Sequence, residues 1–91
     1  MEELIQEVRE DYQIPPYYPD SGIKRLIEEA KAYLDSLNTG CDYQTDITYR
    51  SLIKKYCYYS YHHKVDEFIK NYQSMILTWQ LESEVLTDAT T

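Results

Sequence analysis

The apolar residues between positions 47 and 81 fall on two opposite sides of a helical wheel. At about 100° per residue, the two sets centre roughly 170° apart. One straight helix cannot bury both sets in one core, so the sequence predicts a tight turn near His63–Asp66, with Asp66 capping the helix that follows. The alternative is a continuous helix that buries both faces against neighbouring subunits. The first set is Leu52, Ile53, Tyr56, Tyr59 and His63, and the second is Val65, Phe68, Ile69, Tyr72, Ile76 and Trp79.

A short helix is predicted at the start of the chain, over residues 2–12. Its first turn carries Glu2 and Glu3, which the positive end of the helix dipole favours. Three prolines at positions 15, 16 and 19 follow. Because residues before proline avoid the helical region, these prolines predict an extended connection.

A second helix is predicted from its unbroken apolar stripe between Ile23 and Leu37. We expect Asp20 or Ser21 to cap its start. The stretch Asn38-Thr39-Gly40 predicts its end, because glycine readily takes the left-handed conformation. Asp46 is the expected cap of the third helix.

These segments predict an all-α fold: a small single-domain bundle of about four helices, the first short and the others longer. The domain spans residues 1–81, and residues 82–91 form an acidic tail that is either disordered or packed on a neighbour. A chain of 91 residues buries a small core, so oligomerisation is an expected source of stability. The predicted core is Leu26, Ile27, Ala30, Leu34, Leu37, Leu52, Ile53, Tyr56, Phe68, Ile69, Tyr72, Ile76 and Trp79.

The charge is unevenly distributed along a chain whose formal net charge is −7. Residues 1–38 carry nine acids against four bases, residues 47–70 carry five bases against two acids, and residues 80–91 carry three acids and no base. The overall acidity disfavours a protein that binds nucleic acid through its phosphates. The asymmetry predicts a surface that faces a partner.

No catalytic signature is present. The sequence has no glycine-rich phosphate loop, GxSxG or HExxH motif, and only two glycines. We therefore expect no enzyme activity and no cofactor. His62 with Asp66, or His63 with Glu67, has the spacing of two metal ligands on a continuous helix, but two ligands without a third favour no metal site.

The two cysteines, Cys41 and Cys57, have no metal-binding or redox spacing. With no signal peptide in the sequence, we expect reduced thiols in a cytosolic setting. No apolar run approaches the roughly 20 residues that a membrane span needs, so no membrane association is expected.

One face of the predicted third helix carries two cations and two tyrosines. Arg50, Lys54, Tyr58 and Tyr61 follow one another at spacings of four, four and three. This face lies opposite the apolar stripe, so we expect it to be exposed. We predict that these four residues form an interaction surface, with acidic surfaces in residues 1–38 or in the tail of another copy as their complement. The alternative is an ordinary solvated face.

The layout resembles the phage head–tail connector, or head completion, family over residues 2–85. The segments that carry the resemblance are "IKRLIEEAKAYLDSLNTG", "CDYQTD" and "SLIKKYCYYSYHHKVDEFIKNYQSMILTWQLESEV". The most specific parts are Ala30–Leu34 running on to Gly40, Lys55–Tyr59, and Asp66–Phe68 with Asn71 and Tyr72. These are packing motifs and not a chemical signature. The loop between the second and third helices is short, so a long channel-lining loop is not evident.

The resemblance implies a structural virion protein at the head–tail interface, made in the cytoplasm of the bacterial host. Copies would form a homo-oligomeric ring beneath the portal protein, extend the DNA channel and offer a platform for a downstream connector or tail-completion protein. We expect the subunit or portal contact to be made by Arg50, Lys54, Tyr58 and Tyr61. DNA would pass without specific binding, and we expect an acidic lumen to repel it. The alternative function is a small helical DNA-binding or regulatory protein that uses the Arg/Lys/Tyr stripe.

Overall fold

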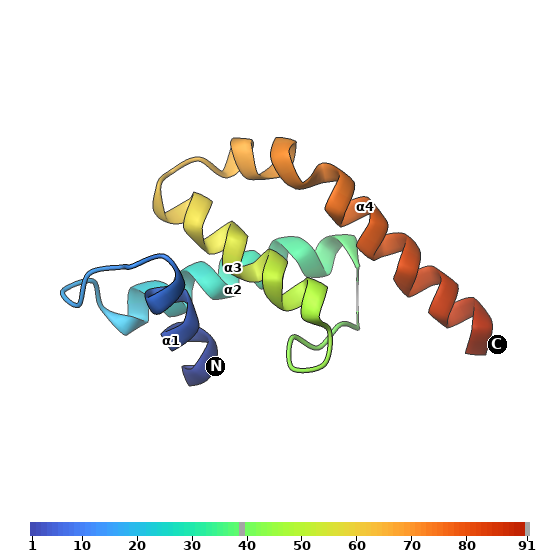
Figure 1. Cartoon of the computed structure of the whole chain (residues 1–91), viewed down its shortest axis with the longest axis horizontal. Coiled ribbons are helices and arrows are strands. Elements are labelled where there is room, and N and C mark those ends of the chain that lie inside the picture. The colour runs from blue at the N-terminus through green and yellow to red at the C-terminus, as the bar shows by residue number, and fades with distance from the viewer. Residues whose placement is uncertain (39, 91) are drawn as a thin grey trace.

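Four α-helices make up the part of the chain that the structure describes, and they pack into an elongated body (Figure 1). The computed structural model describes residues 1–38 and 40–90, with side chains through Glu82, and this part of the chain contains no strand. The short first helix and three longer helices agree with the predicted bundle. They are α1 (Glu2–Asp11), α2 (Asp20–Leu37), α3 (Ile47–Tyr61) and α4 (Val65–Thr90).

The predicted turn between the two opposed apolar stripes is confirmed. Helix α3 ends at Tyr61 and α4 begins at Val65. His63 takes a left-handed φ of 57° and is exposed, so it does not belong to the buried stripe of α3 as expected. Asp66 as the cap of α4 is also wrong: the helix begins one residue earlier, and the Lys64 carbonyl accepts the amides of Glu67 and Phe68 at 3.0 and 3.3 Å. The continuous-helix alternative is thereby excluded.

The predicted helix caps have different outcomes. Asp46 caps α3, since its carboxylate accepts the Tyr49 amide at 3.0 Å. Neither Asp20 nor Ser21 caps α2: the helix starts at Asp20 after Pro19, without a side-chain cap bond. Helix α2 ends at Leu37, and Gly40 has the expected left-handed conformation with φ 82°. Thr39 lies outside the described residues.

The core lies where α2, α3 and α4 meet, and α1 adds Leu4, Ile5 and Val8 to it. Most of the predicted core is buried. The prediction that Ile69 belongs to the core is wrong, because this residue is 39% exposed. Leu37, the last residue of α2, and Tyr72 are only half-buried. Tyr72 has non-helical φ and ψ angles of −113° and 15°. A helical wheel drawn straight through this kink misplaces the residues on one side of it, which accounts for Ile69.

Trp79 fixes the middle of α4 to the beginning of α3. Its indole ring stacks on Tyr49 at a centroid distance of 5.5 Å, and its Nε1 donates to the Asp46 carboxylate at 2.9 Å. The Gln80 amide next to it donates to the Leu37 carbonyl at 2.9 Å, which satisfies an acceptor at the end of α2.

Beyond Trp79 and Gln80, α4 continues away from the other helices (Figure 1). The backbone of the predicted tail is therefore helical through Thr90, and its packing on a neighbour stays a prediction.

Candidate functional site

The cationic stripe of α3 is covered by α1, so the expectation that it is exposed is wrong. Arg50 forms a bidentate ion pair with Glu7, in which its Nε lies 3.2 Å from Oε1. The Lys54 ammonium lies 2.8 Å from Asp11 and 3.3 Å from Glu7. The acidic complement that we expected in residues 1–38 of another copy is thus supplied by α1 of the same chain.

The two tyrosines of the stripe also contact the N-terminal part of the chain. Tyr12 packs on Tyr58 at a centroid distance of 4.8 Å, and Tyr18 meets Tyr61 edge-on at 5.0 Å. Arg50, Lys54 and Tyr61 are partly buried, and Tyr58 is exposed. The two cations of the stripe are therefore paired within the monomer, and Tyr58 is its most exposed residue.

Arg9 holds the proline-rich connection between α1 and α2. Its guanidinium donates to the carbonyl oxygens of Pro15 and Tyr18 and to the carboxylate of Asp20, each at 2.7 Å. A guanidinium presents several donors in a rigid planar arrangement, which suits a fixed set of acceptors. Arg9 thereby positions Tyr18 against α3. The Tyr18 ring also lies over Gly22, where a Cβ would approach it to 2.7 Å.

An aromatic surface forms where this connection meets the end of α3, and we call it the aromatic end. His62 packs edge-on against both Tyr58 and Tyr61, at centroid distances of 4.7 and 5.2 Å. Tyr17 projects from the connection with 86% of its side chain exposed. Tyrosine is enriched at protein interfaces because it offers a large contact area with a polar tip. The aromatic end comprises Tyr17, Tyr18, Tyr58, Tyr61 and His62.

A second surface, which we call the acidic end, lies where α2 ends, α3 begins and α4 leaves the body. Ile47, Leu77 and Leu81 are 84%, 56% and 51% exposed. Residues 35–49 and 71–82 together contain four acids and no Lys or Arg. Hydrogen bonds from Tyr49 to Asp35 at 2.6 Å and from Trp79 to Asp46 hold these segments together. The acidic end comprises Asp35, Asp42, Asp46, Ile47, Leu77, Leu81 and Glu82.

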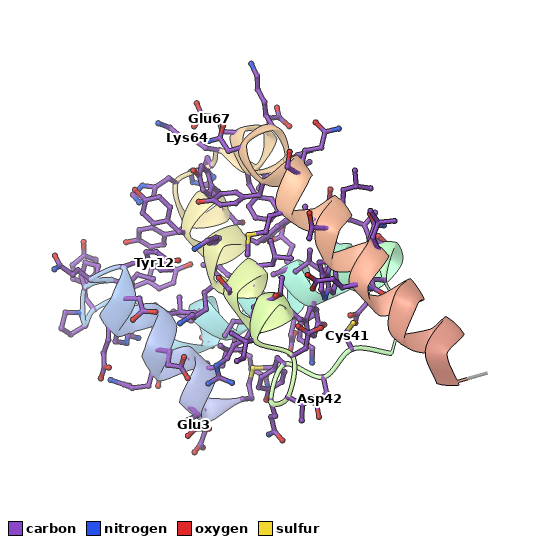
Figure 2. All side chains as sticks on the ribbon, turned by 45° about the vertical axis from the view of Figure 1, so that its right-hand side comes forward. Glu3, Tyr12, Cys41, Asp42, Lys64 and Glu67 are labelled. Atoms are coloured by element: carbon purple, nitrogen blue, oxygen red, sulfur yellow. The ribbon has the colours of Figure 1, made fainter. Side chains whose placement is uncertain are left out.

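The two surfaces are separated along the long axis. The molecule measures 48 × 26 × 18 Å, and Figure 1 shows the connection between α1 and α2 at one extreme and the second half of α4 at the other. In Figure 2, Tyr12, which stacks on the aromatic end, lies across α3 from Cys41 and Asp42. One copy therefore presents two chemically different patches at separate places along its length.

The histidine pairs considered for metal binding do not share a helix. His63 precedes α4 whereas Glu67 lies within it, and the turn removes the i,i+4 geometry. Both residues line an open recess with Lys64, Asp66, Glu29, Ser60 and Val65. Within residues 1–38 and 40–82, no three His, Cys, Asp or Glu side chains are arranged to hold a metal ion.

Cys57 is a core residue. Its side chain is fully buried, and burial, with a smaller contribution from Glu29, raises the pKa of its thiol to about 12. The reactive form of cysteine is the thiolate, so this environment suppresses its nucleophilicity.

Sequence reasoning missed both the cover that α1 places over α3 and the exposure of Ile47, Leu77 and Leu81. The opposite charges of α1 and α3 could have indicated that the two helices pair, but from the sequence we placed these charges on separate copies.

None of the helices that the structure describes has the length and apolarity needed to cross a bilayer. Comparisons with protein-family models, curated proteins and solved structures gave no match.

Proposed function

We propose that this protein is a structural virion subunit of the head–tail connector type. Copies form a ring beneath the phage portal, and the ring extends the DNA channel and receives the next connector or the tail. The observation that carries the proposal is the presence of two different patches, separated along the length of one small helical domain. A contact between unlike patches is heterologous, and repeated heterologous contacts close into a ring when the rotation between copies permits it.

The sequence resemblance and the fold support the same proposal. The resemblance implies a small helical protein, and the chain is a four-helix globule with no strand in its described part. Exposed Ile47, Leu77 and Leu81 leave apolar surface that a neighbour could bury. Burial of such surface between copies would add stability that a domain of this size gains only modestly from its own core.

The acidity of the chain suits a channel protein. A formal net charge of −7 repels the phosphates of DNA, so the duplex could pass through the ring without specific binding. In this proposal the portal protein lies on one side of the ring and a tail-completion protein on the other. The site of action is the head–tail interface of the virion, after synthesis in the host cytoplasm.

The alternative function, a DNA-binding module, would need a cationic surface that is free to contact phosphates. That interpretation used Arg50 and Lys54, and both cations are paired with carboxylates of α1. A DNA-binding protein would have to break these ion pairs before the cations could contact phosphate.

The test is to mix the purified protein with portal particles and to measure light scattering and electron micrographs with and without the portal. We expect a ring of density on one face of the portal, and no shift of duplex DNA in a gel at physiological salt. A protein that stays monomeric at all concentrations and leaves portal particles bare would contradict the proposal. Tight binding of duplex DNA would favour the alternative.

A further inference from the structure

We infer that the aromatic end of one copy binds the acidic end of a second copy. This inference deepens the proposed function, because it assigns the two surfaces through which ring subunits would meet. It also applies to an open chain of subunits, so it can be tested without a portal.

The carboxylates of the acidic end are not neutralised inside the monomer. In the part of the chain whose side chains are described, the acids in ion pairs are Glu7, Asp11 and Asp20. Asp35 and Asp46 receive hydrogen bonds from a phenol and an indole, which are neutral donors. Glu82 is exposed. The negative charge of this end is therefore available to a cation on another molecule.

The aromatic end has cations near it. They are Lys24, Arg25 and Lys64, and the exposed acids beside them are Glu28, Glu29, Asp66 and Glu67. Asp20 is already paired with Arg9. All three cations are exposed, and none of them is in an ion pair within the described residues. Lys64 lies at the turn that follows His62, and in Figure 2 its neighbour is Glu67, in the first turn of α4.

Charge complementarity favours the contact between unlike ends over a contact between like ends. Two acidic ends brought together would oppose four acids with four acids and no base, whereas an aromatic end offers three exposed cations to those acids. Like charges facing each other disfavour an interface, and opposite charges steer the encounter.

Exposed apolar residues of the acidic end also fit the rings of the aromatic end. Leu77 and Leu81 lie one helical turn apart, so they form a short ridge on the outer side of α4. The partner surface consists of tyrosine rings and His62, whose flat faces and edges can surround such a ridge. Apolar anchors at the centre with charged groups around them are the usual composition of a protein interface.

The experiment uses two full-length variants, each blocked at one end. Leu77→Gln/Leu81→Gln blocks the acidic end without adding charge, and Tyr17→Ser/Lys24→Glu/Arg25→Glu blocks the aromatic end. All of these positions are exposed, so we expect unchanged helicity by circular dichroism. Matched controls are Ile69→Gln on α4 and Lys70→Glu, exposed positions outside both ends.

We expect the wild type and both controls to self-associate in sedimentation velocity, with association that weakens as salt rises. Each blocked variant alone should associate at least about tenfold more weakly, because it loses central contacts. A 1:1 mixture of the two blocked variants should form dimers and nothing larger, since only one intact pair of ends remains.

Other outcomes overturn the inference. If the variant blocked at the aromatic end dimerises alone, like ends are the partners, and if the mixture stays monomeric, the two ends do not meet. The same experiment separates this inference from the ring proposal. If the mixture forms dimers but portal particles stay bare, the contact between the two ends holds and the connector role fails. If each blocked variant alone still forms a ring on the portal, the connector role holds and the contact between the two ends fails.

Discussion

The two sides of α3 are held by different physical interactions. One side presents Leu52, Ile53 and Tyr56 to the core that α2 and α4 share, and all three are buried. The other side presents Arg50 and Lys54 to carboxylates of α1. Burial of apolar area stabilises a fold in proportion to that area, whereas partly exposed ion pairs contribute little net energy. We therefore assign stability mainly to the first side and the orientation of α1 mainly to the second.

The largest effect is expected at the apolar side, from Trp79→Ala. Removing a buried aromatic ring costs about 3–5 kcal/mol of unfolding free energy, and this ring also stacks on Tyr49 and donates to Asp46. Urea denaturation followed by circular dichroism measures the change. Leu81→Ala, at an exposed position of the same helix, is the control and should change stability far less. A loss at Trp79 no larger than that of the control would show that α4 is not anchored there.

A smaller effect is expected from Arg9→Gln, at the connection between α1 and α2. The substitution removes bonds to two carbonyl groups and one carboxylate, and hydrogen bonds to charged groups contribute about 1.5–3 kcal/mol. Because Arg9 orders the segment that carries Tyr18, we also expect faster amide exchange over residues 13–19. Gln6→Ala, on the same helix, is the control. Unchanged exchange in this segment would contradict the role of Arg9.

The ion pairs on the polar side should couple by about 1 kcal/mol, since their side chains are only partly buried. A double-mutant cycle with Glu7→Gln and Arg50→Gln measures this energy, and it should shrink in 1 M salt. The charge reversal Arg50→Glu/Lys54→Glu should loosen α1 while the other helices remain folded. If α1 stays protected from amide exchange in that variant, the ion pairs do not orient it.

The smallest effect at neutral pH is expected from Tyr12, whose contribution shows as a loss of stability at alkaline pH. Burial, with a smaller contribution from Asp11, raises the pKa of Tyr12 to about 12, against 10.0 for an ordinary tyrosine. The folded state holds this proton more tightly than the unfolded state. The contribution of Tyr12 is therefore fully present below pH 10 and is lost as the pH rises towards 12. Chemical denaturation between pH 9 and pH 11.5 should show a smaller decline in Tyr12→Phe than in the wild type. Equal declines would mean that Tyr12 does not titrate as its burial implies.

The helices and the turn at residues 62–64 could be predicted because both depend on local sequence. The reversal of the apolar stripe between Tyr59 and Val65 is a property of residue spacing alone. The cover over Arg50 could not be obtained this way, because Glu7 is 43 positions away in the sequence. A polar helix face has the same periodicity whether water or another charged helix covers it. Ile69 was wrongly assigned to the core because the kink at Tyr72 changes the direction of its helix face. The sequence around Tyr72 contains no proline or glycine from which the kink could be predicted.

Cross-linking between the two ends tests the central claim most directly. Ser21→Cys and Thr78→Cys, exposed positions that leave the proposed contact residues in place, are each made in a Cys41→Ser background that keeps the buried Cys57, mixed in equal amounts and oxidised. We predict that disulfides joining position 21 of one chain to position 78 of another predominate over those joining like positions. Predominance of 78–78 or 21–21 products would contradict the account.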